Sequence, residues 1–182
     1  DVFVPLDAII GGPAMAGQGW RMLMESLAAG RSISLPALSV GGAEMAVRIT
    51  GAYASIREQF KMPIGRFEGV QERLARIAGL AYTMNAARVL TAGAVDDGEK
   101  PAVVSAIVKA YLTEGNRPVT NDAVHVLGGA GISRGPRNTV ANAYAALPIG
   151  ITVEGANILT RCLIIFGQGA IRCHPHVLNE IH

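Results

Sequence analysis

One carboxylate near the C-terminal end of this chain has surroundings suited to chemistry. Glu154 is followed by Gly155 in the largely apolar stretch 152–161. Apolar neighbours exclude competing water, and a helix start offers unpaired backbone N–H groups and the positive end of the helix dipole, so such a carboxylate can act as a proton-abstracting base. The alternative is structural, because a glutamate in the first helical turn after Thr152 is more often a cap or dipole partner. The segment alone favours the structural interpretation.

Three other motifs are weaker. The pattern G-x-S-x-G at 131–135 resembles a hydrolase nucleophile turn, but a predicted helix precedes it and too few residues follow it to complete a hydrolase sheet. The glycine-rich stretch 126–131 lacks the G-x-G-x-x-G spacing of dinucleotide-binding turns. Cys173, His174 and His176 could bind a metal ion, but a loosely ordered end of the chain is the simpler interpretation. We expect no metal.

The elements that must position Glu154 are predicted to be helices. Apolar residues recur every three to four positions, with almost no period-two alternation. Pro36 is expected to kink or split the first helix, and Gly128 and Gly129 to end the third. Short connections between long amphipathic helices predict an all-α fold, an antiparallel helical bundle. The predicted helices cover residues 20–60, 67–95, 101–127, 136–146 and 153–171.

Composition narrows the function classes. The 182 residues are 50% hydrophobic and 16% charged, which suits one buried core in a single domain or in a piece of a larger protein. A net charge of +2 without a basic cluster, together with 5% aromatic residues, argues against nucleic acid as a partner. Cys162 and Cys173 lie in or beside one predicted helix, which favours free thiols in a reducing compartment. Apolar runs are too short for a membrane span, so the apolar excess predicts helix packing, including between subunits.

Three short segments together carry a family resemblance. The sequence Arg-Glu-Gln-Phe at 57–60 closes one helix, Ala-Val-His-Val-Leu-Gly-Gly-Ala-Gly at 123–131 closes another, and Val-Glu-Gly at 153–155 opens a third. In this order and spacing they resemble the C-terminal helical domain of acyl-CoA dehydrogenases, over nearly all of residues 1–172. The residues around Gly12, 147–150 and 171–175 are most similar to the large bacterial long-chain enzymes of fatty-acid degradation.

The resemblance implies a reaction. Glu154 would be the catalytic base that removes the α-proton of a medium- or long-chain fatty acyl-CoA, while the β-hydrogen leaves as hydride to FAD and trans-2-enoyl-CoA forms. Gly155 would contact substrate and cofactor closely because it has no side chain. Arg31 would support the base electrostatically, its alternative being an exposed helix charge. Ala156 stands where many members carry threonine, which removes one expected hydrogen bond to the flavin.

The resemblance also assigns cofactor contacts. Arg57 would pair with the FAD pyrophosphate across a subunit interface, and Phe60 would pack on the cofactor. Gly128 and Gly129 would admit its close approach to the backbone. His125 stands where glutamine is usual and would donate one hydrogen bond, or would be an ordinary core or surface residue.

The same comparison predicts the organisation of the parent protein. Residues 1–16 would be the end of a middle β-domain and a linker, so the fold includes a remnant strand or loop at the N-terminus. Residues 17–172 would form the bundle, and 173–182 a tail. The parent would be a homo-oligomeric (dimeric or tetrameric) enzyme of the bacterial cytoplasm, with possible peripheral membrane association, that passes electrons to an electron-transferring flavoprotein. This chain alone would be inactive.

Two alternatives stay open. One is an acyl-CoA oxidase-like relative that passes electrons to oxygen. The other is a non-catalytic helical oligomerisation module, against which Glu154, Arg57 and the glycine pair argue together.

Small residues at 28–30 would leave room for a long acyl tail.

Overall fold

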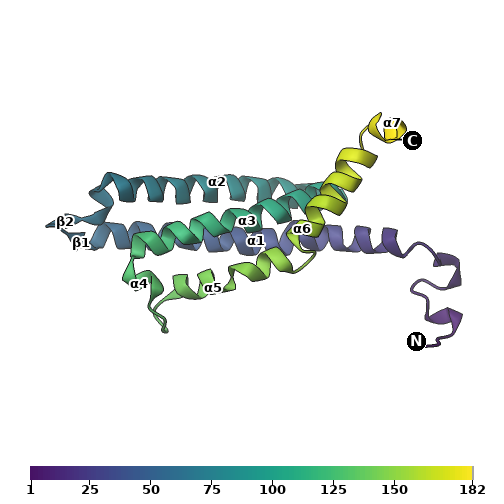
Figure 1. The fold of residues 1–182 in the computed structure, drawn as a ribbon, viewed down its shortest axis with the longest axis horizontal. Helices are drawn as coiled ribbons and strands as arrows, with labels where there is room; N and C mark the ends of the chain where they lie inside the picture. The colour runs from purple at the N-terminus through teal and green to yellow at the C-terminus, as the bar shows by residue number, and fades with distance from the viewer. Residues whose placement is uncertain (182) are drawn as a thin grey trace.

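The chain folds into a bundle of helices in the computed structural model, which describes residues 1–181, without the side chains at 28, 29, 32 and 139 (Figure 1). Three long helices, α1 (Gly19–Ile56), α2 (Glu68–Asp96) and α3 (Ala102–Leu127), lie side by side and contact one another. Their bounds agree closely with the predicted helices. The all-α bundle is therefore confirmed.

Shorter helices complete the bundle. The one-turn α4 (Gly129–Ile132) leads to α5 (Thr139–Thr152), which packs mainly on α3. The short α6 (Asn157–Leu159) continues into the π-helical segment η4 (Thr160–Arg172), which also contacts α3, and α7 (Val177–Ile181) follows. Compared with the predicted helices, α5 ends six residues later than expected and the last long helix begins at Asn157 instead of Val153.

Helix α1 runs through Pro36 as one helix of 38 residues, so the expected split does not occur. Proline removes one backbone donor from a helix and crowds the preceding turn. Here the Pro36 side chain is fully buried, so packing within the bundle offsets that cost. The two ends of α1 therefore belong to a single element.

Of the expected remnant strand or loop, the N-terminal residues form a loop. Residues 1–5 have no regular structure, and two 3-10 turns, η1 (Leu6–Ala8) and η2 (Pro13–Met15), precede α1. A strand needs a neighbouring backbone to pair with. The strands that the described residues contain, β1 (Glu58–Gln59) and β2 (Met62–Pro63), pair only with each other at the far end of α1 (Figure 1).

The C-terminal residues are more regular than expected. Instead of a loosely ordered tail, a turn after η4 leads into α7. The Nδ1 atom of His174 accepts hydrogen bonds from the backbone N–H groups of His176 and Val177, each at 3.2 Å. His174 therefore caps the start of α7.

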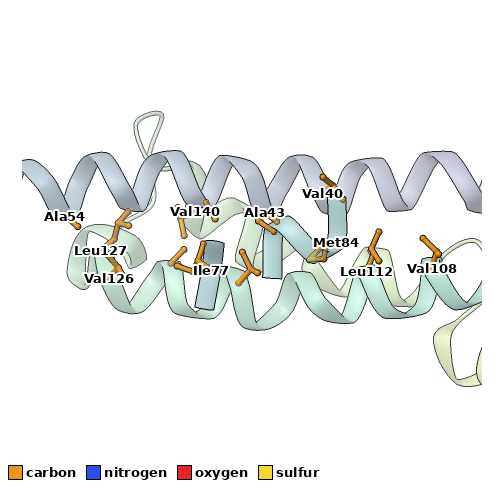
Figure 2. Packing of buried hydrophobic residues seen from close by; sticks show 14 residues of the cluster. Val40, Ala43, Ala54, Ile77, Met84, Val108, Leu112, Val126, Leu127 and Val140 are labelled. Atoms are coloured by element: carbon orange, nitrogen blue, oxygen red, sulfur yellow. The ribbon is translucent and has the colours of Figure 1, made fainter. Parts of the chain in front are cut away.

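The core lies between the three long helices (Figure 2). Alanines on α1 such as Ala43 and Ala54, which are fully buried, let the neighbouring helices approach closely. The side chains packed there come from α1, α2, α3 and α5, and include Val40, Ala43, Ala54, Ile77, Met84, Val108, Leu112, Val126, Leu127 and Val140.

A buried ion pair adds to the contact between α2 and α3. Asp122 of α3 is buried and accepts hydrogen bonds from the guanidinium groups of Arg73 and Arg76 of α2. Burial alone would raise the pKa of the Asp122 carboxyl, but the bonds and charges of Arg76 and Arg73 outweigh it, so the pKa is lowered. Asp122 is therefore ionised and paired at neutral pH.

No single helix within residues 1–181 is long and apolar enough to cross a membrane; the segments 140–152 and 157–172 meet that criterion only jointly, across a 40° bend. Cys162 and Cys173 are exposed free thiols.

Candidate active site

Glu154 and Gly155 lie in a sharp bend between α5 and α6, outside any helix. Both have left-handed backbone conformations, with φ of +54° for Glu154 and +87° for Gly155. Such a φ is unfavourable for a residue with a side chain, so Glu154 carries backbone strain. The prediction that Glu154 opens a helix is therefore wrong, because two successive left-handed residues interrupt the helix and Ala156 becomes its N-terminal flank.

The carboxylate of Glu154 rests against helix α1. The hydroxyl Oγ of Ser34 lies 2.8 Å from Oε1 and 2.9 Å from Oε2 of Glu154. The carboxylate thus contacts a side chain distant in sequence and not the backbone N–H groups at a helix start. This arrangement is not that of a helix cap, so the capping interpretation is wrong.

Arg31 of α1 binds the backbone of the bend. Its side chain is buried, with the residue 6% exposed, and its Nε donates to the backbone carbonyl of Glu154 at 3.2 Å. Burial lowers the pKa of the Arg31 guanidinium, and the charge of Glu154 opposes that shift. The alternative of an exposed helix charge is wrong. Within the described part of the chain, Nη1 of Arg31 is buried without a hydrogen-bond acceptor.

Lys109 supports the same bend from α3. It is fully buried, and its Nζ donates to the Gly155 carbonyl and to Asn157 Oδ1, both at 2.8 Å. Burial lowers the pKa of the Lys109 ammonium, and the charge of Glu154 partly counteracts this shift. The hydroxyl of Thr160 donates to the same Gly155 carbonyl at 3.1 Å. The strained bend is therefore held through its backbone by two buried cations.

Asn157 ties the start of α6 to α3. Its Nδ2 lies 3.0 Å from Thr113 Oγ1 and 3.3 Å from Glu114 Oε1. Sequence reasoning missed Ser34, Lys109 and Asn157. For Lys109 a signal existed, because a lysine stands at a core position of the apolar pattern in 103–112.

The bend leaves one backbone donor free. Among the residues that the structure describes, the backbone N–H of Glu154 has no acceptor. An unpaired N–H beside an exposed carboxylate can stabilise negative charge that develops on an oxygen while the carboxylate takes up a proton. The bend therefore offers a base and an oxyanion donor within one residue.

A second group of predicted residues lies around the end of α1. Arg57 is the exposed residue that follows α1, and its Nη2 donates to Gln59 Oε1 at 3.1 Å. Phe60 and Lys61 form the tip of the β1–β2 hairpin with φ of +51° and +67°. The Phe60 ring is 79% exposed and stands edge-on to Phe67, with centroids 6.3 Å apart.

A cavity of about 700 Å³ lies between Arg57 and the residues at the end of α3. Arg57, Leu127, Ala130 and Arg137 are among its lining residues. Gly128 has φ of +58°, and a Cβ added at Gly128 or Gly129 would meet no atom within 4 Å. The two arginines of the lining favour an anionic group such as a pyrophosphate, and Glu58 in the same lining opposes one. Arg137 was missed by sequence reasoning.

His125 differs from the other predicted cofactor residues. It is exposed in the last turn of α3 and does not line the cavity. The cavity therefore gives no support to the predicted contact between His125 and the cofactor.

The two groups do not form one site within a single chain. Arg31 and Arg57 are about 26 positions apart on the same helix, and at about 1.5 Å per residue this places them ~39 Å from each other. The structure brings Glu154 and Gly155 together with Arg31, and separately places Arg57 on a cavity with Leu127 and Ala130, which flank the glycine pair. A ligand that uses both groups must therefore contact more than one copy of the chain or extend far along it.

Cys173, His174 and His176 are the candidate metal ligands near the C-terminal end of the chain. Within residues 1–181, no group of three His, Cys, Asp or Glu side chains is placed to hold a metal ion. The side chain of Ala28 or Ala29, expected to make room for an acyl tail, lies outside the described residues.

Known proteins share this fold. The chain is similar to a glutaryl-coenzyme A dehydrogenase whose structure was solved with glutaryl-CoA: the TM-score is 0.76, the sequence identity 29%, and the match covers 86% of this chain and 39% of that one. It is also 30% identical over 189 residues to the probable acyl-CoA dehydrogenase FadE10 of Mycobacterium tuberculosis, which covers 99% of this chain and 28% of that protein. A stretch of 52 residues is 65% identical to the protein HemX of Proteus mirabilis, covering 29% of this chain and 31% of that protein.

The chain spans 28% of the length of FadE10 and 39% of that of the glutaryl-coenzyme A dehydrogenase, so both are much longer than this chain. Residues 17–166 match the family model described as the acyl-CoA dehydrogenase C-terminal domain. That range covers most of the chain and all of the residues that form the bend and the cavity. The chain therefore belongs to the acyl-CoA dehydrogenase family.

Proposed function

We propose that this chain supplies the catalytic base of an FAD-dependent acyl-CoA dehydrogenase. Glu154 removes the α-proton of an acyl-CoA thioester, and the product is a trans-2-enoyl-CoA. The observation that carries the proposal is the strained bend at Glu154. Its carboxylate is exposed, its backbone N–H has no acceptor among the described residues, and the buried Arg31 and Lys109 bind its carbonyls. Strain of this kind persists only where the surrounding structure holds it, and it is common at active sites.

The residues of the bend have separable tasks. Glu154 takes up the proton, and its backbone N–H binds the thioester oxygen on which negative charge develops. Arg31 and Lys109 hold the two carbonyls that follow this N–H, those of Glu154 and Gly155, and so restrain the backbone of the bend. Gly155 leaves the approach to the bend free of a side chain. FAD, when bound, accepts the β-hydrogen as hydride.

The cavity at the other end of α1 fits the phosphate portion of the same cofactor. Arg57 and Arg137 would hold the pyrophosphate, the glycine pair would admit it close to the backbone, and Phe60 and His125 would contact other parts of it. Because Arg57 lies ~39 Å along α1 from Arg31, which binds the Glu154 carbonyl, we propose that each FAD contacts two subunits, which requires a homo-oligomer.

The first test is flavin bleaching. Full-length protein carrying this chain is mixed anaerobically with acyl-CoAs of increasing length, as wild type and as Glu154→Gln, which keeps the shape and removes the base. Bleaching by the wild type that is lost in the variant supports the proposal. Equal bleaching by both would place the base elsewhere, and no bleaching in either would favour a non-catalytic helical module.

The sharing of FAD between subunits has its own test. Full-length Glu154→Gln and Arg57→Ala proteins are each expected to be inactive or flavin-poor, and the two are dissociated, mixed and reassembled. If one FAD uses Glu154 from one subunit and Arg57 from another, mixed oligomers contain some intact sites and activity returns. Activity that stays absent in verified mixed oligomers would contradict shared sites.

Substrate and electron acceptor are finer parts of the proposal. The chain resembles the large bacterial long-chain enzymes, so we propose a medium- or long-chain fatty acyl-CoA as substrate and fatty-acid β-oxidation as the process. The proposed electron acceptor is an electron-transferring flavoprotein. The chain-length profile of bleaching tests the substrate. Reoxidation of the reduced enzyme by an electron-transferring flavoprotein, compared with reoxidation by oxygen, separates a dehydrogenase from an oxidase.

We also propose that residues 1–16 belong to the end of a preceding domain and its linker, that 17–172 form the helical domain, and that 173–182 follow it. Limited proteolysis of the full-length protein, with cleavage near residue 16 preferred over cleavage inside α1, tests this boundary.

A further inference from the structure

The hydroxyl of Ser34 lies among three oxygen atoms. Its Oγ is 2.8 Å and 2.9 Å from the two carboxylate oxygens of Glu154, and 2.9 Å from the backbone carbonyl of Gly30. A serine hydroxyl has one proton to donate and lone pairs that accept. It can therefore donate to only one of these oxygens at a time, and it has a second acceptor available.

Ser55, on the same helix, lacks this choice. Its Oγ donates to the Gly51 carbonyl at 2.8 Å, the same four-residue step back along the helix, with no carboxylate nearby among its hydrogen-bond partners. The bond from a helical serine to a carbonyl one turn earlier is common. What distinguishes Ser34 is its contact with the carboxyl group of Glu154.

We propose that Ser34 is a positioning residue for the base and holds the carboxyl group of Glu154 in both of its protonation states; this inference rests on the proposed function. While Glu154 is ionised, the Ser34 hydroxyl donates to the carboxylate. After the α-proton of the substrate has moved to Glu154, the new O–H group of Glu154 donates to Ser34 Oγ, and the Ser34 proton turns to the Gly30 carbonyl. The abstracted proton stays on Glu154 and Ser34 keeps its own.

The surrounding charges do not perform this task. Arg31 from α1 and Lys109 from α3 bind backbone carbonyls of the bend, and Glu114 of α3 binds Asn157. Within the part of the chain that the structure describes, Ser34 is the side chain that bonds the carboxylate oxygens of Glu154. The direction of the carboxylate therefore depends on this hydroxyl.

Loss of the hydroxyl has two consequences. The ionised carboxylate loses its donor, so the acid limb of the pH–rate profile moves to higher pH. The carboxylate also becomes free to rotate, and the rate of flavin reduction falls. A hydrogen bond to a charged group typically changes an equilibrium or rate by about 10-fold or more, and we expect about 10-fold at this exposed position.

The experiment compares four full-length proteins: wild type, Ser34→Ala, Ser34→Thr and Ser55→Ala. The rate of anaerobic flavin reduction is measured against pH and acyl-CoA concentration. We expect Ser34→Ala to be about 10-fold slower, with unchanged half-saturation by substrate and an acid limb at higher pH. Ser34→Thr keeps a hydroxyl and should recover most of the rate, and Ser55→Ala should match the wild type.

A second readout needs no activity. Thermal unfolding midpoints are measured for Ser34→Ala alone, for Glu154→Ala alone and for both changes together. If the two side chains bond each other, the Ser34→Ala shift is smaller in the Glu154→Ala background, whereas the Ser55→Ala shift is the same in both. Shifts for Ser34 and Glu154 that simply add would overturn the contact.

The outcomes separate the inference from the proposed function. If wild type reduces its flavin and Ser34→Ala matches it in rate and pH profile, the positioning role is wrong and Glu154 can still be the base. If wild type shows no reduction by any acyl-CoA, the proposed function fails and the positioning role fails with it. If Ser34→Thr is as slow as Ser34→Ala while both stay folded, the hydroxyl is not what positions the base.

Discussion

Replacing Gly155 by alanine tests whether the strained bend positions the base. Gly155 has φ of +87°, a conformation that costs a residue with a Cβ about 1–2 kcal/mol. The added Cβ would lie 3.2 Å from Thr160 Oγ1, which is tight, and 3.8 Å from Nη2 of Arg31. The backbone cannot relax without moving a carbonyl that Lys109 and Thr160 both bind. We therefore expect Gly155→Ala to lower the free energy of unfolding by about 1–2 kcal/mol.

The effect on the reaction should be larger than this loss of stability suggests. Any relaxation at Gly155 moves the neighbouring Glu154, and a misplacement of about 1 Å can cost ~100-fold in rate. Gly98 supplies a matched control, because it has φ of +84° in the connection after α2 and a Cβ there would meet no atom within 4 Å. Gly98→Ala should lose similar stability and keep the wild-type rate.

The assay pairs urea unfolding with the rate of anaerobic flavin reduction in the full-length protein. A wild-type rate in Gly155→Ala, with the expected loss of stability, would show that the base does not depend on the geometry of this bend. A loss of stability far below that of Gly98→Ala would show that the bend relaxes freely and stores no strain.

Three further changes test a buried ion pair, a strained backbone position and a buried lysine. Asp122→Asn should lower the free energy of unfolding by about 1–3 kcal/mol at pH 7, because Arg73 and Arg76 lose a charged partner. Since the pKa of Asp122 is lowered in the folded state, its contribution is present above the ordinary aspartate pKa of about 3.9 and is lost as pH falls, so urea unfolding should show a smaller difference from wild type at pH 3. Lys61→Gly should raise stability by about 1 kcal/mol in thermal unfolding, because Lys61 has φ of +67°. Lys109→Met should remove a pH dependence: the pKa of Lys109 is lowered by burial, so the folded state releases this proton first and the stability of wild type rises towards pH 10 more than that of the variant.

The long helices were predictable because their signals are local. Apolar spacing sets the buried face of each helix, and Gly98, Pro101 and Gly128 mark ends within a few residues of the observed ones. These residues restrict the backbone at their own positions, whatever the rest of the chain does. The same local reasoning failed at Pro36, where burial in the bundle outweighs the preference of proline for a helix end.

The bend at Glu154 was not predictable for the opposite reason. Its left-handed backbone is held by Arg31, 123 positions away, and by Lys109, 46 positions from Gly155. Nothing in the residues at 152–157 except Gly155 signals such a conformation, so the local pattern favours a continuous helix start. Ser34 was invisible for the same reason, since its sequence context is that of an ordinary polar residue on a helix. The identity of Glu154 as a candidate base was nevertheless available from sequence, because it depended on a family motif and not on its backbone.

The continuity of α1 connects the two candidate sites. Ser34 and Arg31, which contact Glu154, lie near one end of this helix, and Arg57, which lines the cavity, follows its other end. A hinge at Pro36 would let these two groups move relative to each other. Because Pro36 is buried and α1 is unbroken, the distance from the base to the arginine cavity is set by a packed helix and not by a flexible connection. If a cofactor is shared between subunits, as proposed above, it meets a fixed spacing in each, so the assembly of subunits decides whether both ends engage one FAD.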